Sequence, residues 1–387
     1  MKTLTRLLQS YSDTTVAVSP DGWSAFVRLL ASRRPVRIAA FTGEHSADRS
    51  GLWSDFAARC QGVDLCRFRA IPPEPDLACI GRMVDFLRDC QADMVVALGG
   101  GSAMDAAKAA YLSAQTGAPV ESFFGVNQYS DKNSRRLDTV VCFPTTSGTG
   151  SEVTPYSNIV DRDAQVKRLI SDPAIIPEHA FVLPEYTSGL PQRITLATGC
   201  DALAHLVEGF LNVGADANDS LANERALAGI ELVTRHLPEA LADTGGRAEM
   251  ALAATLGGMV IRHKSTGLPN LCSFSWFGRL EHGLAAIMLL PECWRYYLGN
   301  PAVRERTMQL NAIFPGATPE EVIAACRHFL DACGVPARLH DVPGLNQELL
   351  ETTAKSAGLN RMKLELAPRP VDPDNSYNVL LDILQRS

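Results

Sequence analysis

At 387 residues, with 46% hydrophobic and 20% charged residues, the chain is long enough for two domains and has the composition of a globular enzyme. Its net charge of −7, from 36 basic and 43 acidic residues, and the lack of a basic run longer than two residues argue against nucleic-acid binding. Ten widely spaced cysteines without a CxxC pair indicate free thiols in a reducing compartment. The first ten residues lack a long apolar core, and runs such as 284–290 are too short to cross a bilayer. We therefore expect a cytoplasmic protein with no membrane partner.

The N-terminal half alternates short apolar runs with segments of helical composition. Strands are expected at 15–18, 36–41, 63–67, 94–98 and 139–143, and helices at 22–32, 53–60, 77–91 and 103–114. Repeated strand–helix alternation predicts a doubly wound parallel sheet.

The C-terminal half has a different sequence pattern, because strand-like apolar runs are absent after about residue 184. Helical periodicity is expected at 194–211, 219–237, 248–262, 284–298, 319–332, 345–357 and 377–384. The sequence thus predicts an α/β domain over residues 1–184 and an all-helical domain over residues 185–387.

One strand of the first domain runs directly into three glycines. Gly99, Gly100 and Gly101 follow the apolar run 94–98, and Ser102 is expected to open an alanine-rich helix as its N-cap. Glycines let the backbone approach a pyrophosphate, and the free N–H groups at a helix start face the anion. The pattern predicts a phosphate-binding turn, with a tight strand–helix turn that binds nothing as the alternative.

A second loop, 144–152, is dense in hydroxyls and glycine and follows the strand 139–143. Its hydroxyl side chains can donate hydrogen bonds to phosphate or ribose oxygens. An ordinary surface connection is the alternative. The position favours a ligand site, because ligands of open α/β sheets bind beyond the carboxyl ends of the strands.

The helical half contains a candidate metal site. Asp201 and His205 are four residues apart and share one helix face, which makes half of a divalent-metal site. His282, just before the apolar run 284–290, could supply a second imidazole. The alternatives are an exposed Asp–His pair or a helix-capping aspartate, and a histidine that binds no metal.

Together these segments resemble the iron-containing (group III) alcohol dehydrogenase family over about residues 35 to 300. The matching motifs are Gly99–Ser102 with Asp105 and Lys108, the loop Thr145–Glu152, the segment Thr198–His205 followed by Glu208, and His282-Gly283 running into Leu289-Leu290-Pro291. The resemblance implies a Rossmann-like dinucleotide-binding domain with a parallel sheet and a C-terminal helical domain that binds metal and substrate, as in the dehydroquinate synthase-like fold. It places cofactor and metal in the cleft between the domains.

The resemblance also implies the ligands and their residues. It implies NADH or NADPH, a divalent metal (Fe²⁺ first, then Zn²⁺), a small carbonyl substrate and a homodimer. The implied cofactor-binding residues are Thr42, Gly43, Gly99, Gly100, Gly101, Ser102, Asp105, Thr145, Thr146, Ser147, Thr149 and Lys167. The implied metal ligands are Asp201, His205, Asn270 and His282, with His205 and His282 also catalytic.

The metal motif departs from the family at one ligand. The family histidine eleven residues after the methionine of its Gly-Met segment falls on Asn270, and a second family histidine falls on Phe274. An asparagine oxygen binds hard divalent cations, but more weakly than imidazole binds iron or zinc. His263 is a possible substitute, although it lies seven residues earlier. We expect a site that alters one ligand or has lost the metal.

The cofactor motif departs from the family at Gly43. Many members carry an aspartate there, which meets the ribose 2′-hydroxyl and repels a 2′-phosphate, so its absence admits NADPH. Thr42-Gly43 and Ser273-Phe274 are more similar to the phosphonoacetaldehyde reductase branch. Three basic residues could attract a phosphonate or form a solvated basic face: Arg262, Lys264 and Arg279.

The expected function is that of a metal-assisted, NAD(P)H-dependent alcohol dehydrogenase or reductase of a small aldehyde or ketone, such as phosphonoacetaldehyde. No protein general acid is evident, because the second family histidine is missing, so water or a ribose hydroxyl would relay the proton. Two alternatives stay open. One is an enzyme of the same fold with another reaction, of the polyol phosphate dehydrogenase or dehydroquinate synthase type. The other is a nucleotide-binding protein whose metal site has decayed at Asn270.

Overall fold

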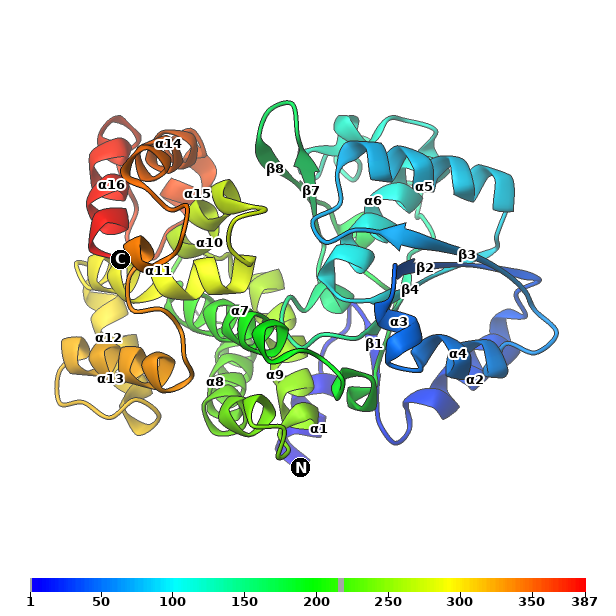
Figure 1. The fold of residues 1–387 in the computed structure, drawn as a ribbon, viewed down its shortest axis with the longest axis horizontal. Coiled ribbons are helices and arrows are strands. Elements are labelled where there is room, and N and C mark those ends of the chain that lie inside the picture. The colour runs from blue at the N-terminus through cyan, green and yellow to red at the C-terminus, as the bar shows by residue number, and fades with distance from the viewer. Residues whose placement is uncertain (1, 215–218) are drawn as a thin grey trace. The chain divides into compact units, whose positions relative to one another are not determined.

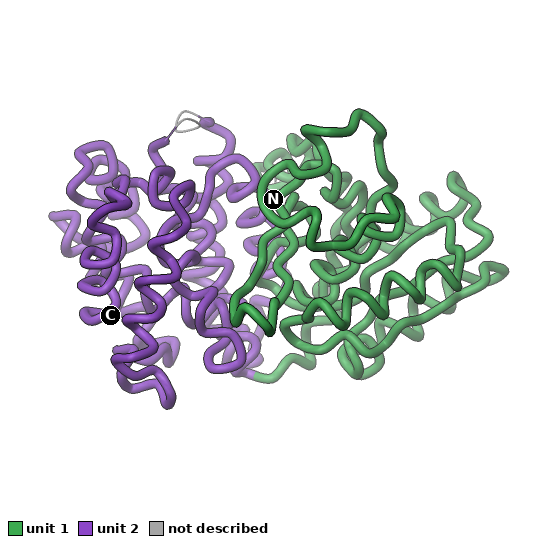
Figure 2. The backbone as a smooth tube through the Cα atoms, turned by 90° about the horizontal axis from the view of Figure 1, so that it is seen from above, with its two compact units in different colours: residues 1–191 green, residues 192–387 purple. Residues whose placement is uncertain are grey.

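The structure, a computed structural model, describes residues 2–214 and 219–387. Two compact units divide the chain, residues 1–191 and 192–387 (Figure 2). The division expected after residue 184 falls inside a short 3-10 helix, Pro184–Thr187, that ends the first unit.

The first unit is built on a six-stranded sheet with the order β1-β9-β6-β4-β2-β3, of which Figure 1 labels β1, β2, β3 and β4. Every neighbouring pair is parallel, which confirms the predicted parallel sheet. In sequence order the strands are β1 (Thr15–Val18), β2 (Arg37–Gly43), β3 (Asp64–Ile71), β4 (Met94–Gly99), β6 (Val141–Pro144) and β9 (His179–Val182). The helices of this unit are α1 (Lys2–Gln9), α2 (Gly22–Arg33), α3 (Ser46–Arg49), α4 (Leu52–Arg59), α5 (Leu77–Cys90) and α6 (Gly101–Thr116).

The central strand β4 is buried along its whole length, which explains its continuous apolar sequence. Val95 and Ala97 contribute to a core that also contains residues of α5 and α6. Val96 and Leu98 contribute to a second core, with residues of α2 and α4. Because successive side chains of a strand point to opposite faces, the two cores lie on the two faces of the sheet, as a doubly wound fold requires.

A second, three-stranded sheet with the order β5-β8-β7 was not predicted. It contains the antiparallel pair β7 (Tyr156–Asp161) and β8 (Val166–Ser171), together with β5 (Gly125–Val126). The pair escaped prediction because β8 carries Lys167 and Arg168 and is mostly only half-buried, so it lacks an apolar run. The strand β9 and the helix α1 were missed as well.

The second unit contains only helices among its described residues, 192–214 and 219–387. They are α7 (Gln192–Leu211), α8 (Ser220–Leu241), α9 (Arg247–His263), α10 (Leu268–Ser273), α11 (His282–Tyr297), α12 (Pro301–Gln309), α13 (Pro319–Ala332), α14 (Gln347–Gly358), α15 (Arg361–Glu365) and α16 (Ser376–Arg386). This confirms the predicted helical half. The short helices α10, α12 and α15 were not predicted, because each spans fewer than three turns and shows too little periodicity.

The helix α7 lies at the centre of this unit and packs against α8, α9 and α11. It is the one described helix that is long and apolar enough to cross a membrane, with a mean hydropathy of 1.2 over an 18-residue window. Of that window 83% is buried within the protein, which is also the pattern of a core helix. The importance of α7 is that it places Asp201, His205 and Glu208 in the interior.

Candidate functional site

Three potential metal ligands come together in the helical unit. Asp201 and His205 lie on α7, and His282 is the first residue of α11. The Oδ1 atom of Asp201 lies 3.6 Å from Nε2 of His205 and 3.7 Å from Nε2 of His282. One ligand atom from each residue falls within 4.8 Å of the other two. The structure therefore assembles the three ligands that the sequence suggested.

The cluster leaves polar atoms without partners. Oδ1 of Asp201 and Nδ1 of His205 are buried and make no hydrogen bond. A buried polar atom left unpaired costs about 1–3 kcal/mol, so such atoms require an explanation. A carboxylate with two imidazoles is a donor set that suits a divalent transition metal such as iron or zinc. The residues thus fit the metal that the sequence resemblance implies.

A glycine allows the two helices to approach closely enough for this cluster. A Cβ atom at Gly283 would lie 2.0 Å from the carbonyl oxygen of Ala197 and 2.6 Å from Cβ of Asp201. Any larger residue there would push the start of α11 away from α7. The His282-Gly283 pair therefore combines a ligand with the small residue that brings this ligand to Asp201.

Asn270 adds an oxygen to the same cluster. It is buried on α10, and its Oδ1 lies 3.0 Å from Nε2 of His282. Its Nδ2 points the other way and donates to Oε1 of Glu208 at 2.5 Å. The carboxamide is therefore held with its oxygen toward the candidate metal ligands, as expected for a fourth ligand.

The neighbours of His282 fix its ring. Oγ of Ser273 lies 3.0 Å from Nδ1 of His282 and donates to the backbone oxygen of Asn270 at 2.8 Å. The serine hydroxyl thus holds the Nδ1 side of the ring, and Nε2 is the ring nitrogen that faces Asn270 and Asp201. Phe274 stacks on the imidazole with ring centroids 5.5 Å apart. The aromatic ring that replaces the second family histidine thus supports the ligand but offers no proton.

Two expectations about this region need correction. His263 ends α9 and is not part of the ligand cluster, so it does not substitute for the missing histidine; Asn270 reaches the cluster from α10 instead. Lys264 does not lie on a solvated basic face, whereas Arg279 is exposed, as that alternative expects. The ammonium of Lys264 is buried and donates to Oδ1 of Asn223 at 2.6 Å, and Arg279 donates to the backbone oxygen of Gly344 at 3.3 Å.

The sequence did not predict the contacts that Glu208 makes beside the ligand cluster. Its carboxylate is fully buried and accepts hydrogen bonds from Asn270 and, at 2.6 Å, from the backbone N–H of Gly267. Burial raises the pKa of this carboxyl to about 7, although both donors and Lys363 act in the opposite direction. The spacing Asp201, His205, Glu208 was the available signal, since positions i, i+4 and i+7 share one helix face.

The glycine turn of the first unit begins its helix differently from the prediction. The N-cap of α6 is Gly100, and the helix begins at Gly101. Ser102 is not the cap: its hydroxyl accepts a hydrogen bond from the backbone N–H of Glu74 at 3.2 Å. The free N–H groups at the start of α6 are therefore presented by glycines, which place no side chain in front of an anion.

The glycine turn and the hydroxyl loop interlock. The backbone N–H of Thr145 donates to the oxygen of Gly99 at 3.0 Å. A Cβ atom at Gly101 would lie 2.5 Å from Cγ2 of Thr149, and one at Gly100 would lie 3.0 Å from Thr146. The structure thus brings together the two segments that the sequence proposed as cofactor loops. Ser147 is buried in the second of them.

Asp105 and Lys108 tie this loop to α6. Asp105 accepts from the hydroxyl of Ser151 at 2.5 Å and from the backbone N–H of Asn158 at 2.9 Å. The buried ammonium of Lys108 donates to three backbone oxygens, those of Ser151 at 2.8 Å, Thr154 at 3.2 Å and Tyr156 at 2.6 Å. Burial lowers the pKa of Lys108, and the nearby Asp105 opposes that shift. In this structure both side chains shape the loop, and a direct role of Asp105 in cofactor binding stays a prediction.

Lys167 is linked to the glycine turn by its ion pair with Glu74. Its Nζ is 2.8 Å from Oε1 of Glu74, the residue whose backbone binds Ser102. The side chain of Lys167 is only 9% exposed. It is therefore held near the turn as the resemblance implies, with its charge matched by Glu74.

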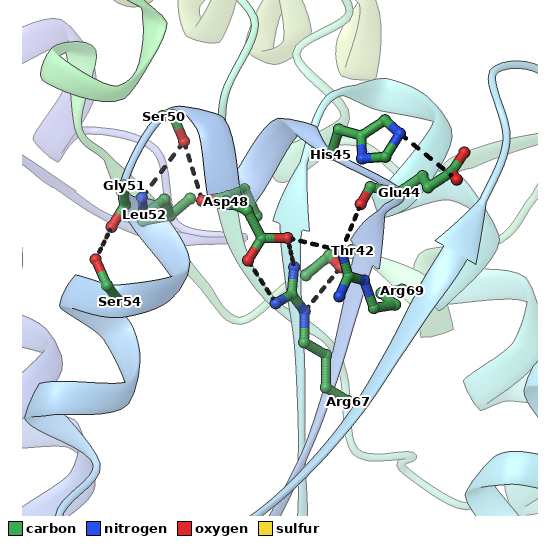
Figure 3. A network of polar contacts seen from close by, with 11 residues as sticks. Thr42, Glu44, His45, Asp48, Ser50, Gly51, Leu52, Ser54, Arg67 and Arg69 are labelled. Carbon is green, nitrogen blue, oxygen red and sulfur yellow. Dashed lines mark hydrogen bonds and ion pairs between the residues drawn. The ribbon is translucent and has the colours of Figure 1, made fainter.

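The end of β2 carries Thr42 and Gly43, and a basic pair lies beside them (Figure 3). Arg67 donates to Thr42 Oγ1 at 3.1 Å and holds Asp48 with two hydrogen bonds of 2.8 and 2.7 Å. Arg69 reaches the backbone oxygen of Glu44 at 3.3 Å and is 58% exposed. The Arg67 guanidinium holds the pKa of the Asp48 carboxyl below its usual value. The carboxylate of Asp48, close to this strand end, is thus paired with an arginine.

Comparison with known proteins agrees with this architecture. The family model for iron-containing alcohol dehydrogenase matches residues 14–184, and the model for the C-terminal part of the Fe-containing alcohol dehydrogenase family matches residues 195–384. The chain belongs to the iron-containing alcohol dehydrogenase family. It is an alcohol dehydrogenase with the family's metal-dependent, NAD(P)-linked chemistry and the family's Asp/His/His cluster.

Individual relatives show how far the similarity extends. The NAD-dependent methanol dehydrogenase of Bacillus methanolicus is 30% identical over 76% of this chain and 78% of its own length. The 1-propanol dehydrogenase PduQ of Salmonella typhimurium is 31% identical over 82% of this chain and 85% of its own. The structure of an iron-containing alcohol dehydrogenase from Thermotoga maritima superposes with a TM-score of 0.82 at 27% identity, covering 97% and 98% of the two chains. These matches confirm the predicted fold.

Proposed function

We propose that this alcohol dehydrogenase reduces small aldehydes to primary alcohols with NADPH or NADH, and that Asp201, His205 and His282 hold the catalytic divalent metal with Asn270 as a fourth ligand. The observation that carries the proposal is the buried cluster with an unpaired carboxylate oxygen, joined by the inward-facing oxygen of Asn270. The geometry disfavours a decayed site, because decay would remove the pressure to keep such atoms buried and unpaired.

When bound, the metal supplies a Lewis acid for the carbonyl oxygen and the nicotinamide supplies the hydride. Asp201 contributes negative charge that balances the cation, while Ser273 holds the His282 ring with Nε2 toward Asp201 and Asn270. Phe274 stacks on His282 and has no proton to give. Position 274 therefore supplies no proton to the product alcohol, and water or a ribose hydroxyl of the bound cofactor would have to supply it.

We expect NADPH to be used at least as well as NADH. Gly43 lacks the carboxylate that would repel a 2′-phosphate, and Arg69 beside it offers a partly exposed positive charge. Gly43→Asp should then shift the ratio of kcat/KM toward NADH by about a hundredfold, which is about 2.7 kcal/mol. A Cβ atom at Gly43 would lie 3.2 Å from Oγ of Ser46, so Gly43→Ala is the matched steric control and should leave the ratio near that of the parent.

The substrate class is a proposal of its own. The names of the relatives, methanol and 1-propanol dehydrogenases, support short unbranched aldehydes as first candidates. Phosphonoacetaldehyde is the second candidate, suggested by Thr42-Gly43 and Ser273-Phe274. Its weakness is that Lys264 and Arg279, two of the three basic residues proposed for a phosphonate, make other hydrogen bonds.

The test is NAD(P)H oxidation by the purified protein, reconstituted with Fe²⁺ or Zn²⁺, with a panel of aldehydes. The panel includes formaldehyde, propionaldehyde, phosphonoacetaldehyde and a polyol phosphate in the oxidative direction. We expect the neutral aldehydes to be reduced fastest. Turnover restricted to the polyol phosphate would move the chain to another reaction of the same fold. A homodimer and a cytoplasmic location stay predictions, which size-exclusion chromatography and cell fractionation would check.

A further inference from the structure

Glu208 is buried on the same face of α7 as the metal ligands Asp201 and His205, yet it is not part of the ligand cluster. Both of its oxygens are used by α10 and the turn before it. Oε1 accepts from Nδ2 of Asn270, and Oε2 accepts from the backbone N–H of Gly267. A buried carboxylate costs free energy unless it is fully hydrogen-bonded. These contacts show what holds this one in place.

We propose that Glu208 is a positioning residue: it turns the Asn270 carboxamide so that Oδ1 faces the cation site and serves as the fourth protein ligand. This inference rests on the proposed metal-dependent function. An ionised carboxylate can only accept hydrogen bonds, so the amide nitrogen must face Glu208. The amide oxygen then has to face Nε2 of His282, which lies 3.0 Å away.

The 3.0 Å separation is the distance expected for two ligands of one cation. Ligand atoms about 2.1 Å from a metal and at right angles to each other are about 3.0 Å apart. In the metal-free chain an Nε2–H of His282 can donate to this oxygen, and a bound cation would take the place of that proton. An asparagine turned the other way would present an amide nitrogen, which cannot bind a metal.

Glu208 also fixes where α10 begins. Gly267 is the N-cap residue of α10, and its N–H is bound by Glu208. The preceding residues are held from the other side by Lys363, whose ammonium donates to Ser265 Oγ at 2.8 Å and to Thr266 Oγ1 at 3.0 Å. Because α10 carries both Asn270 and Ser273, this anchoring places the oxygen ligand and the serine that orients His282.

The orientation matters more for asparagine than for histidine. A neutral amide oxygen is a weaker ligand than an imidazole for iron or zinc, so the site gains most if the amide is already turned toward the metal. Groups that orient metal ligands are typically worth a factor of 10–100 in metal affinity.

The direct test is the Zn²⁺ affinity of purified Glu208→Gln, measured by competition with a chromophoric chelator. The introduced amide offers one acceptor and one donor in place of two acceptors. It can accept from Gly267 and donate to the Asn270 oxygen, which turns the Asn270 nitrogen toward the metal. We expect the affinity to fall by at least tenfold. Glu231→Gln, the same change at an exposed residue of α8 that pairs with Arg235, is the control and should bind like the parent.

A double variant separates orientation from general damage. Glu208→Gln combined with Asn270→Asp keeps the total charge and restores one donor–acceptor pair. The amide at 208 then donates to one oxygen of the new carboxylate, and the other oxygen faces the cation. We expect Zn²⁺ affinity equal to or above that of the parent. Asn270→Ala, which removes the oxygen ligand and keeps the Glu208 carboxyl group, should lose affinity as Glu208→Gln does.

Three outcomes would overturn the inference: parental affinity in Glu208→Gln, parental affinity in Asn270→Ala, or no recovery in the double variant. Asp201→Asn keeps this failure distinct from failure of the proposed function. If Asp201→Asn loses Zn²⁺ while Glu208→Gln retains it, the metal site stands and only the positioning role is wrong. If the parent binds no Zn²⁺, the metal-dependent function and this inference fail together.

Discussion

The glycine turn and hydroxyl loop of the first unit and the ligand cluster of the second use their polar groups in opposite ways. Around the glycine turn the charged groups are engaged: Lys108 donates to three backbone oxygens, and Asp105 accepts from a hydroxyl and an N–H. In the ligand cluster, Oδ1 of Asp201 and Nδ1 of His205 are buried and make no hydrogen bond. Around the glycine turn the polar side chains stabilise the backbone conformation. In the ligand cluster, polar atoms are left available to bind a ligand. A motif residue can therefore serve either purpose, and its hydrogen bonds tell which.

The largest effect should come from Asp201→Asn, which keeps the shape but removes the charge. We expect metal binding to be lost and the rate of aldehyde reduction to fall by about a thousandfold or more, about 4 kcal/mol. The free energy of unfolding of the metal-free chain should not fall, because the substitution removes an uncompensated charge. Urea unfolding and metal analysis check both claims, with Asp331→Asn on α13, a half-exposed partner of Arg327, as the control. Lower metal-free stability of Asp201→Asn alone would show that this carboxylate is structural.

Lys108→Met should show the opposite pattern. It leaves three backbone oxygens without their donor, so we expect the free energy of unfolding to fall by about 3 kcal/mol. NADPH affinity should fall with it, because the hydroxyl loop 144–152 loses its anchor at Ser151. Urea unfolding with fluorescence titration measures both. Lys132→Met, at an exposed lysine bound to Gln128, should change stability by no more than about 0.5 kcal/mol. Unchanged stability in Lys108→Met would contradict the scaffold role.

Gly101→Ala should give the smallest of the three effects. The added methyl would approach Thr149 within 2.5 Å and push the two cofactor loops apart. We expect NADPH affinity to fall about tenfold, or about 1.4 kcal/mol, with little loss of stability. Gly81→Ala on α5, where a Cβ meets nothing within 4 Å, is the matched control and should bind NADPH like the parent. Equal affinity in both variants would show that the loops can move apart without cost.

The sequence was informative where a pattern has one dominant cause. Continuous apolar runs such as 94–98 predicted buried parallel strands, and the periodicity of 319–332 matches α13 residue for residue. Sequence patterns failed to predict β7 and β8, because these partly exposed strands contain both polar and apolar residues. They also failed for Ser102, which has a residue type common at helix N-caps but accepts a hydrogen bond from Glu74 instead.

The candidate site shows the same division. Asp201, His205 and His282 were recognisable from residue type and spacing. The direction of the Asn270 amide and the part of Glu208 were not, because both depend on contacts between α7 and α10, which lie about sixty residues apart in the chain. His263 was a reasonable substitute by sequence distance, but α9 ends there and α10 supplies the ligand atom.

The most direct test of the central claim is the rate of NADPH oxidation with a short aldehyde before and after removal of the metal. The purified protein is stripped with a chelator, its metal content is measured by mass spectrometry, and Fe²⁺ or Zn²⁺ is added back. We predict that activity disappears with the metal and returns on reconstitution, while NADPH binding by fluorescence is unchanged. Full activity in the stripped protein would contradict the Lewis-acid role and leave His205 and His282 as electrostatic or proton-donating groups.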